Sequence, residues 1–149
     1  MNGQQSKSPL TSTEQVEITN SIQRKYAAFT GNRKFVLEGT ADAQAVSLTL
    51  TLKNDDESFF YPVEARMSYR EEGLSQKAAT GVLLDVMDSY FQEFLVNDGE
   101  VYLPIDWQEY ESADGQKLQL RGQIRNMKLE KMADDLLSGS QATAGFGDA

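Results

Sequence analysis

Three stretches in the first half of the chain alternate apolar and polar residues with a period of two. They are KFVLEGTA at 34–41, AVSLTLTLK at 45–53, and a run from about Ser58 to Arg70. A period of two sends successive side chains to opposite faces, so each stretch predicts a strand with one buried and one wet face. Pro62 in the third run favours an edge or strand-end position.

Helical periodicity marks three other stretches. A helix is expected from about residue 12 to Gly31-Asn32, and either of two residue pairs at its N-terminus has the spacing of a capping box. From about Ser75 to Val96 apolar pairs recur every fourth residue, which predicts a long helix lying diagonally across a twisted sheet. The segment 127–137 predicts a short amphipathic helix. The two capping pairs are Thr11 with Glu14 and Ser12 with Gln15.

Residues 101–126 predict a β-hairpin, because two alternating runs flank Asp114-Gly115, which is the signal of a two-residue type I′ turn. That turn places Trp107, the single tryptophan, opposite Gly122. An aromatic side chain that covers a strand glycine shields exposed backbone. We therefore interpret Trp107 as a core or rim anchor, with ligand stacking as the alternative.

These elements predict one α+β domain with the order α-β-β-β-α-β-β-α. Amphipathic strands with short links are typical of an antiparallel sheet, so we expect a five-stranded, largely antiparallel sheet with two to three helices packed on one face. The expected organisation is a flexible N-terminal arm at 1–11, a single domain at 12–137 and a disordered C-terminal tail at 138–149.

The composition removes several kinds of chemistry. The 149 residues include no cysteine and no histidine. Thiolate catalysis, cysteine-bound metals and histidine-based nucleophiles are therefore excluded. An enzyme is accordingly a less favoured class of function. The acidic turn at 54–58 lacks the ligand spacing of an EF-hand, so we expect no metal and no cofactor.

The charge is acidic and unevenly distributed. The net charge is −9, yet residues 1–37 carry five basic and two acidic side chains, and residues 38–149 carry nine basic and 21 acidic ones. Clustered cations are needed for phosphate contacts, so nucleic acid and anionic membranes are not expected partners. No long apolar run or signal peptide is recognisable, and a cytoplasmic location is the expectation.

The wet face of the hairpin carries the candidate site. The predicted register puts tyrosines and an aspartate of one strand beside arginines of the next, and two further arginines join them if the third strand lies nearby. One interpretation is that this face binds a phosphate, a carboxylate or an acidic peptide. The alternative interpretation is that its side chains form ordinary cross-strand ion pairs. The candidate ligand-binding residues are Arg66, Arg70, Tyr102, Asp106, Tyr110, Arg121 and Arg125.

The favoured function is a non-catalytic protein-binding or adaptor domain. The element order and acidic charge resemble those of small acidic bacterial secretion chaperones, and the resemblance implies a homodimer that holds a client segment. The alternative function is a sensor or carrier of a small anion or nucleotide, bound on the arginine- and tyrosine-bearing face. An enzyme ranks third.

Overall fold

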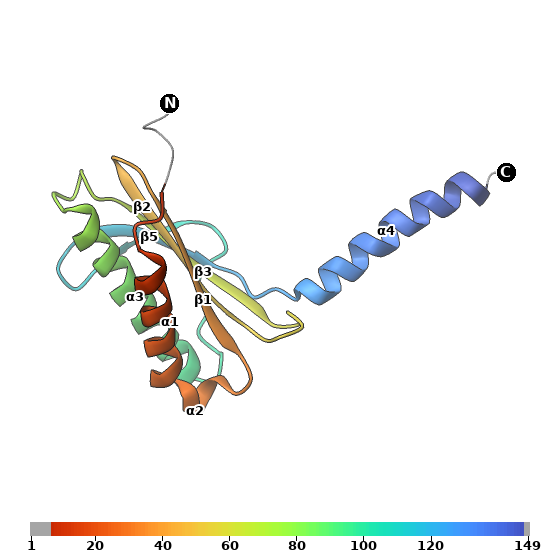
Figure 1. The fold of residues 1–149 in the computed structure, drawn as a ribbon, viewed down its shortest axis with the longest axis horizontal. Coiled ribbons are helices and arrows are strands. Elements are labelled where there is room, and N and C mark those ends of the chain that lie inside the picture. Colours follow the sequence, from red (N-terminus) through yellow and green to blue (C-terminus); the bar gives the residue numbers. More distant parts are fainter. Residues whose placement is uncertain (1–6, 148–149) are drawn as a thin grey trace.

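The computed structural model describes residues 7–147, and its helices and strands follow in the predicted order. Two helices precede the sheet, a long helix interrupts it, and a fourth helix ends the chain (Figure 1). The elements are α1 Ser12–Lys25, α2 Ala27–Thr30, β1 Lys34–Ala41, β2 Ala45–Lys53, β3 Phe60–Ser68, α3 Gln76–Val96, β4 Gln108–Glu111, β5 Lys117–Gly122 and α4 Met127–Gly147.

The five strands form one antiparallel sheet in the order β1-β2-β3-β5-β4. This arrangement confirms the predicted α+β fold and the antiparallel sheet. Pro62 lies near the beginning of β3, just before the pairing with β5 begins at Val63, so its missing N–H does not interrupt that ladder.

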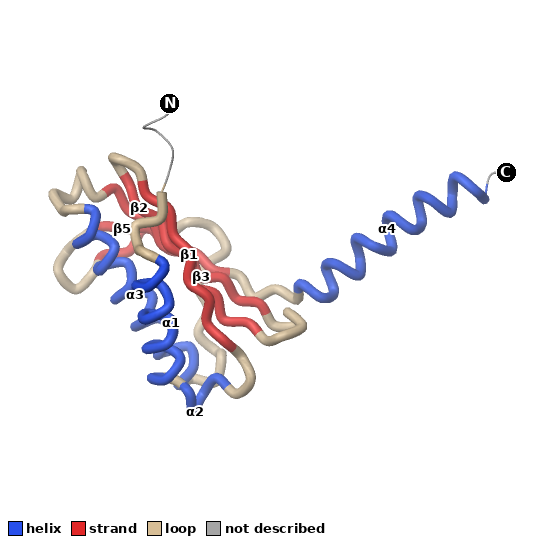
Figure 2. The backbone as a smooth tube through the Cα atoms, viewed as in Figure 1, coloured by secondary structure: helices blue, strands red, loops and turns tan. Residues whose placement is uncertain are grey.

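Helices α1 and α3 lie side by side against one face of the sheet, and no described helix covers the opposite face, called the open face below (Figure 2). The period of two in β1 to β3 sends one set of side chains beneath these helices, where they are buried. Tyr61, Phe91 and Phe94 pack edge to face or tilted at the centre of this core.

The helix beginnings follow their sequence signals. Thr11 accepts a hydrogen bond from the Glu14 backbone N–H at 3.1 Å, and the Glu14 carboxylate accepts one from the Thr11 N–H at 2.9 Å. Of the two predicted capping boxes, this pair is therefore the one that forms. Ser75 caps α3 by accepting from the Ala78 N–H at 3.1 Å.

Part of the predicted N-terminal arm is held against the sheet. Residues 1–6 lie outside the described residues. Lys7 exchanges two backbone hydrogen bonds with Ala41, at 2.9 and 2.6 Å, and the Pro9 ring lies against Gly39. The segment from residue 7 onward thus lies along the outer edge of β1.

Helix α4 continues to Gly147, well past residue 137, where the amphipathic pattern predicted its end. It points away from the sheet and from the other helices (Figure 1). Its first turn is attached to the β2–β3 turn, because the Met127 N–H donates to Glu57 O at 2.8 Å and Lys128 contacts Asp56 at 3.3 Å. Arg125 also forms an ion pair with Glu130 across the beginning of the helix.

Candidate functional site

The hairpin register differs from the predicted one by a single residue. The loop contains three residues, since the Ser112 N–H bonds to Gln116 O at 2.8 Å and the strands pair as Glu111 with Lys117. A type I′ turn needs positive φ at both central residues, but in this loop only Gly115 has it, at 85°. The loop is therefore a tight turn followed by one left-handed glycine, and the predicted two-residue turn is wrong.

A one-residue shift moves every side chain of a strand to the other face. Tyr110 now pairs with Leu118, whose side chain is buried beneath the helices, so Tyr110 lies on the helix side instead of the open face. Trp107 moves the opposite way, to the open face beside Arg66 and Arg121. The side chains nearest to Gly122 are Tyr61 and Leu103, and the prediction that Trp107 covers this glycine is wrong.

Trp107, Arg66 and Arg121 form a stacked cluster on the open face that joins β3 and β5 to the residue just before β4. The guanidinium carbons of Arg66 and Arg121 lie 3.8 and 4.3 Å from the indole centroid. Both arginines already have protein partners: Arg121 bonds to both oxygens of Glu64, at 2.8 and 3.3 Å, and Arg66 donates to Gln119 at 2.7 Å. The cluster therefore fixes the β4 side of the sheet through cation–π contacts and ion pairing.

The other predicted site residues do not join this cluster. Arg70 donates to Ala43 O at 2.9 Å beyond the end of β3, and Arg125 pairs with Glu130 at the base of α4. Tyr102 is 63% exposed and packs its ring edge to face on Phe94, with the centroids 6.3 Å apart. Asp106 is exposed in the segment before β4.

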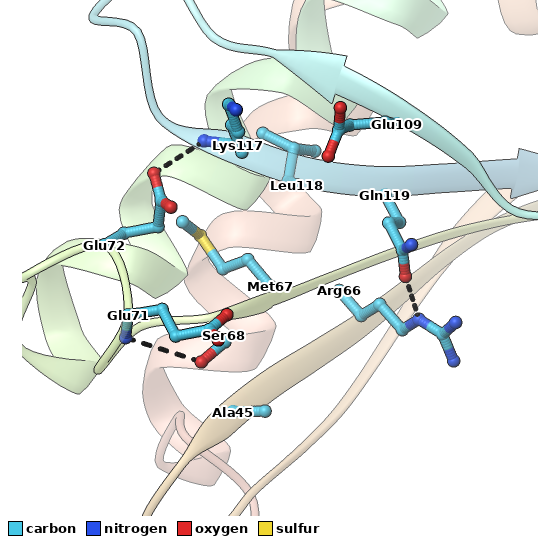
Figure 3. A pocket seen from close by; sticks show the side chains of 10 residues that line it. All are labelled: Ala45, Arg66, Met67, Ser68, Glu71, Glu72, Glu109, Lys117, Leu118 and Gln119. Carbon is cyan, nitrogen blue, oxygen red and sulfur yellow. Dashed lines mark hydrogen bonds between the residues drawn. The ribbon is translucent and has the colours of Figure 1, made fainter.

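A hollow of about 370 Å³ lies next to the cluster, where the pairing of β3 with β5 ends. Figure 3 shows its lining, in which Glu71, Glu72 and Glu109 outnumber the cationic Arg66 and Lys117. The Glu72 carboxylate accepts from the Lys117 backbone N–H at 2.8 Å. This acidic lining suits a cationic group better than the anion that the arginines predicted.

A groove runs between α3 and the β4–β5 hairpin. It consists of two adjoining hollows, of about 180 and 210 Å³, that share Val86, Ser89 and Tyr110. Its walls are otherwise largely apolar, but carboxylate side chains of both α3 and the hairpin lie along it. The acidic lining residues are Asp85, Glu93 and Asp114.

Two buried tyrosines anchor the segment that leads from α3 to β4. The Tyr61 hydroxyl accepts from the Leu103 N–H at 3.2 Å and bonds to the Tyr90 hydroxyl, which donates to Val101 O at 2.7 Å. Burial raises the pKa of both hydroxyls, and Tyr61 raises that of Tyr90 further, so both stay protonated at neutral pH. The chain of hydrogen bonds holds one wall of the groove in place.

Helix α4 carries an uncovered apolar stripe. Four large side chains spaced three, four and one residues apart are between 50% and 68% exposed, and this spacing puts them on one side of the helix. They are Leu129, Met132, Leu136 and Leu137. The sequence signalled the amphipathic pattern, but not that no other element among residues 7–147 covers it.

Two kinds of feature are absent from the described part of the chain. No group of three or more Asp or Glu side chains among residues 7–147 is arranged to hold a metal ion. Within the same range, no helix has the length and apolar character that crossing a membrane requires. Comparisons with protein-family models, curated proteins and solved structures give no match to this chain.

Proposed function

We propose that this chain is a non-catalytic protein-binding protein of the adaptor type, and that it forms a homodimer through α4. The observation that carries the proposal is the exposed stripe of Leu129, Met132, Leu136 and Leu137 on a helix that points away from its own domain (Figure 1). A contiguous apolar surface of this kind typically marks a protein interface.

Physical chemistry supports a partner on this stripe. Burial of a Leu or Met side chain contributes about 1.5–3 kcal/mol relative to its exposure to water. An isolated helix gains little stability in water without such tertiary packing. Because contacts with Glu57 and Asp56 hold the first turn, the helix presents its stripe in one direction. A partner therefore binds to a helix whose orientation is already partly fixed.

A second copy of the chain fits the stripe. In an antiparallel pair of α4 helices centred near Met132 and Ala133, Leu129 of one copy lies beside Leu136 of the other. Such an isologous contact buries the same patch on both copies. Residues 127–138 carry two basic and three acidic side chains, so repulsion between the two helices is small despite the net charge of −9.

The anion-sensor alternative receives less support from the geometry. Arg121 and Arg125 are each paired with a carboxylate, and the neighbouring hollow is acidic. Ligand binding by the predicted residues stays a prediction, to be tested by thermal shift with a panel of anions and the Arg121→Ala variant as control. The cytoplasmic location and the likeness to bacterial secretion chaperones also stay predictions.

The test of the proposed function is the native mass of the full chain in solution. A dimer has twice the 16.6 kDa mass of the chain. Leu136→Glu places a charge in the stripe and should give a monomer. Ser138→Glu adds the same charge 200° around the helix, on its polar side, and should stay dimeric. A monomeric wild-type protein, or equal masses for the two variants, would contradict α4 pairing.

A further inference from the structure

The outer side of β4 is a free sheet edge. In the sheet order β4 is terminal, and no other described strand pairs with its outer side. Because Ser112 bonds to Gln116, the antiparallel alternation directs the backbone groups of Tyr110 and Gln108 toward β5. The N–H and C=O groups of Glu109 and Glu111 therefore point outward, away from the sheet.

The two faces beside this edge differ in character. On the open face, the carboxylates of Glu109 and Glu111 follow Trp107 along the strand. On the helix side, Tyr110 reaches the groove between the hairpin and α3, whose walls include Val86 and Leu103. A strand added next to β4 would thus meet the carboxylates of Glu109 and Glu111 on one face and, on the other, a groove whose apolar walls also carry Asp85, Glu93 and Asp114.

We propose that β4 binds an extended segment of a partner protein in which basic and aliphatic residues alternate, as a sixth strand of the sheet. The basic side chains lie beside Glu109 and Glu111, and the aliphatic ones enter the groove next to Tyr110. Main-chain hydrogen bonds give affinity in this mode of recognition, and alternate side chains give specificity. The inference rests on the proposed protein-binding function and names a second surface and the chemistry of its client.

Charge selects this kind of partner. Acidic side chains stand on both sides of the edge, and residues 38–149 carry 21 acidic against nine basic side chains. Opposite charges on neighbouring strands are stabilising, whereas like charges directly opposite are destabilising. A second copy of β4 would place glutamates against glutamates, so this edge is unsuited to pairing with itself and suited to a basic strand.

The probe is a fluorescently labelled, acetylated peptide with alternating Lys and Val, and its binding is measured by anisotropy. The control peptide has the same composition, with the Lys and Val residues grouped in two blocks. The alternating peptide should bind at least about tenfold more tightly, because only it pairs along β4 with one kind of side chain on each face. Equal affinities would mean that net charge alone attracts the peptide, and would overturn the inference.

Two matched pairs of variants locate the site. Glu109→Pro removes the charge and an outward N–H and should weaken binding roughly tenfold, whereas Glu109→Ala removes only the charge and should cost about twofold to fivefold. Ser89→Arg places a cation in the groove and should abolish binding, whereas Gln92→Arg, on an exposed part of α3 that does not line the groove, should not. Equal effects within either pair would overturn the inference.

Amide exchange in the wild-type protein provides a measurement that needs no substitution. The alternating peptide should slow exchange of the Glu109 and Glu111 amides, and protection confined to other strands would contradict pairing at β4. The native mass and the peptide binding of the wild-type protein separate this inference from α4 pairing. A wild-type dimer that does not bind the peptide refutes only the β4 inference, and a wild-type monomer that binds it refutes only the pairing through α4. The Leu136→Glu variant should be a monomer that still binds the peptide.

Discussion

The two edges of the sheet are built in opposite ways. At β1 the preceding chain covers the edge: Lys7 pairs with Ala41, Gln15 donates to Leu37 O, and Gln23 accepts from the Phe35 N–H at 2.9 Å. At β4 the strand has only four residues, all exposed, and none of the other described strands pairs with it from outside. One edge is closed by side chains and backbone, and the other is limited by its short length and its charge.

This difference indicates where a new strand can bind. Natural sheets protect their edges by coverage, by short edge strands or by charge. Coverage blocks a partner of either charge where the outward backbone groups are already bonded, as at Phe35, Leu37 and Ala41. Charge blocks only partners of the same sign, so the acidic β4 edge excludes other acidic strands and remains accessible to basic ones.

The largest expected effect follows from removal of the hydroxyl that fixes the chain leading to β4. Tyr90→Phe removes the hydrogen-bond partner of Val101 O and one of the two partners of the buried Tyr61 hydroxyl, and should lower the free energy of unfolding by about 2 kcal/mol. Urea unfolding measures the change. Tyr69→Phe, which loses one hydrogen bond to Asp42 O at a more exposed position, should cost less than half as much. Equal losses of stability in the two variants would show that the buried hydrogen bonds do not hold the segment that leads to β4.

A smaller loss of stability is expected when the β1 edge is uncovered. Gln23→Ala removes the acceptor of the Phe35 N–H and the donor to Arg33 O, and should lower the free energy of unfolding by about 1–2 kcal/mol. It should also speed exchange of the Phe35 amide. Gln92→Ala, at an exposed position on α3, is the control and should change neither value. An unchanged Phe35 exchange rate in Gln23→Ala would mean that other groups close this edge.

The stacked cluster on the open face should contribute less to stability than either of these hydrogen-bond networks. A double-mutant cycle between Trp107→Ala and Arg66→Ala should give a coupling of about 0.5–1 kcal/mol, as for other exposed cation–π pairs. The same cycle with Arg70→Ala, whose guanidinium bonds to Ala43 O instead, should give no coupling. Coupling of similar size in both cycles would contradict the observed register of the hairpin.

The smallest effect concerns the base of α4 and depends on pH. Hydrogen bonds from Ser58 and the neighbouring Lys128 lower the pKa of Asp56 to about 2, and Arg125 lowers the pKa of Glu130. Because these folded-state pKa values lie below the unfolded ones, their stabilising effect is complete above about pH 5 and is lost as pH falls toward 2. Far-ultraviolet circular dichroism should show helix loss over this range.

The variant Asp56→Asn/Glu130→Gln provides the control for this pH effect. Neither replacement side chain titrates, so the double variant should lose less helix signal than the wild-type protein between pH 5 and pH 2. Identical acid profiles would show that these two carboxylates do not stabilise the base of α4.

The sequence predicted the repetitive elements well, because their periods report burial directly. Alternation at 34–41 and 45–53 gave the bounds of β1 and β2 as the structure has them, and the paired stripe gave α3. These patterns extend over many residues, and each additional residue supports the same assignment. The antiparallel order followed from short links between amphipathic strands.

The candidate site was harder to predict because it depended on one turn. Asp114-Gly115 is compatible with a two-residue and a three-residue loop, and the choice between them decides which face receives Trp107 and which receives Tyr110. Arg66 and Arg121 were predicted on the same face, and the structure does bring them together. The exposure of the α4 stripe has no signal in sequence, since an amphipathic helix looks the same with and without a covering partner.

The most direct test of the central claim compares amide exchange at the two edges of the free protein. We expect slow exchange for Phe35 and Ala41, whose N–H groups are bonded to Gln23 and Lys7, and fast exchange for Glu109 and Glu111, whose N–H groups point outward. Protection of Glu109 and Glu111 equal to that of Phe35 and Ala41 would show that the β4 edge is already covered, and would contradict the account.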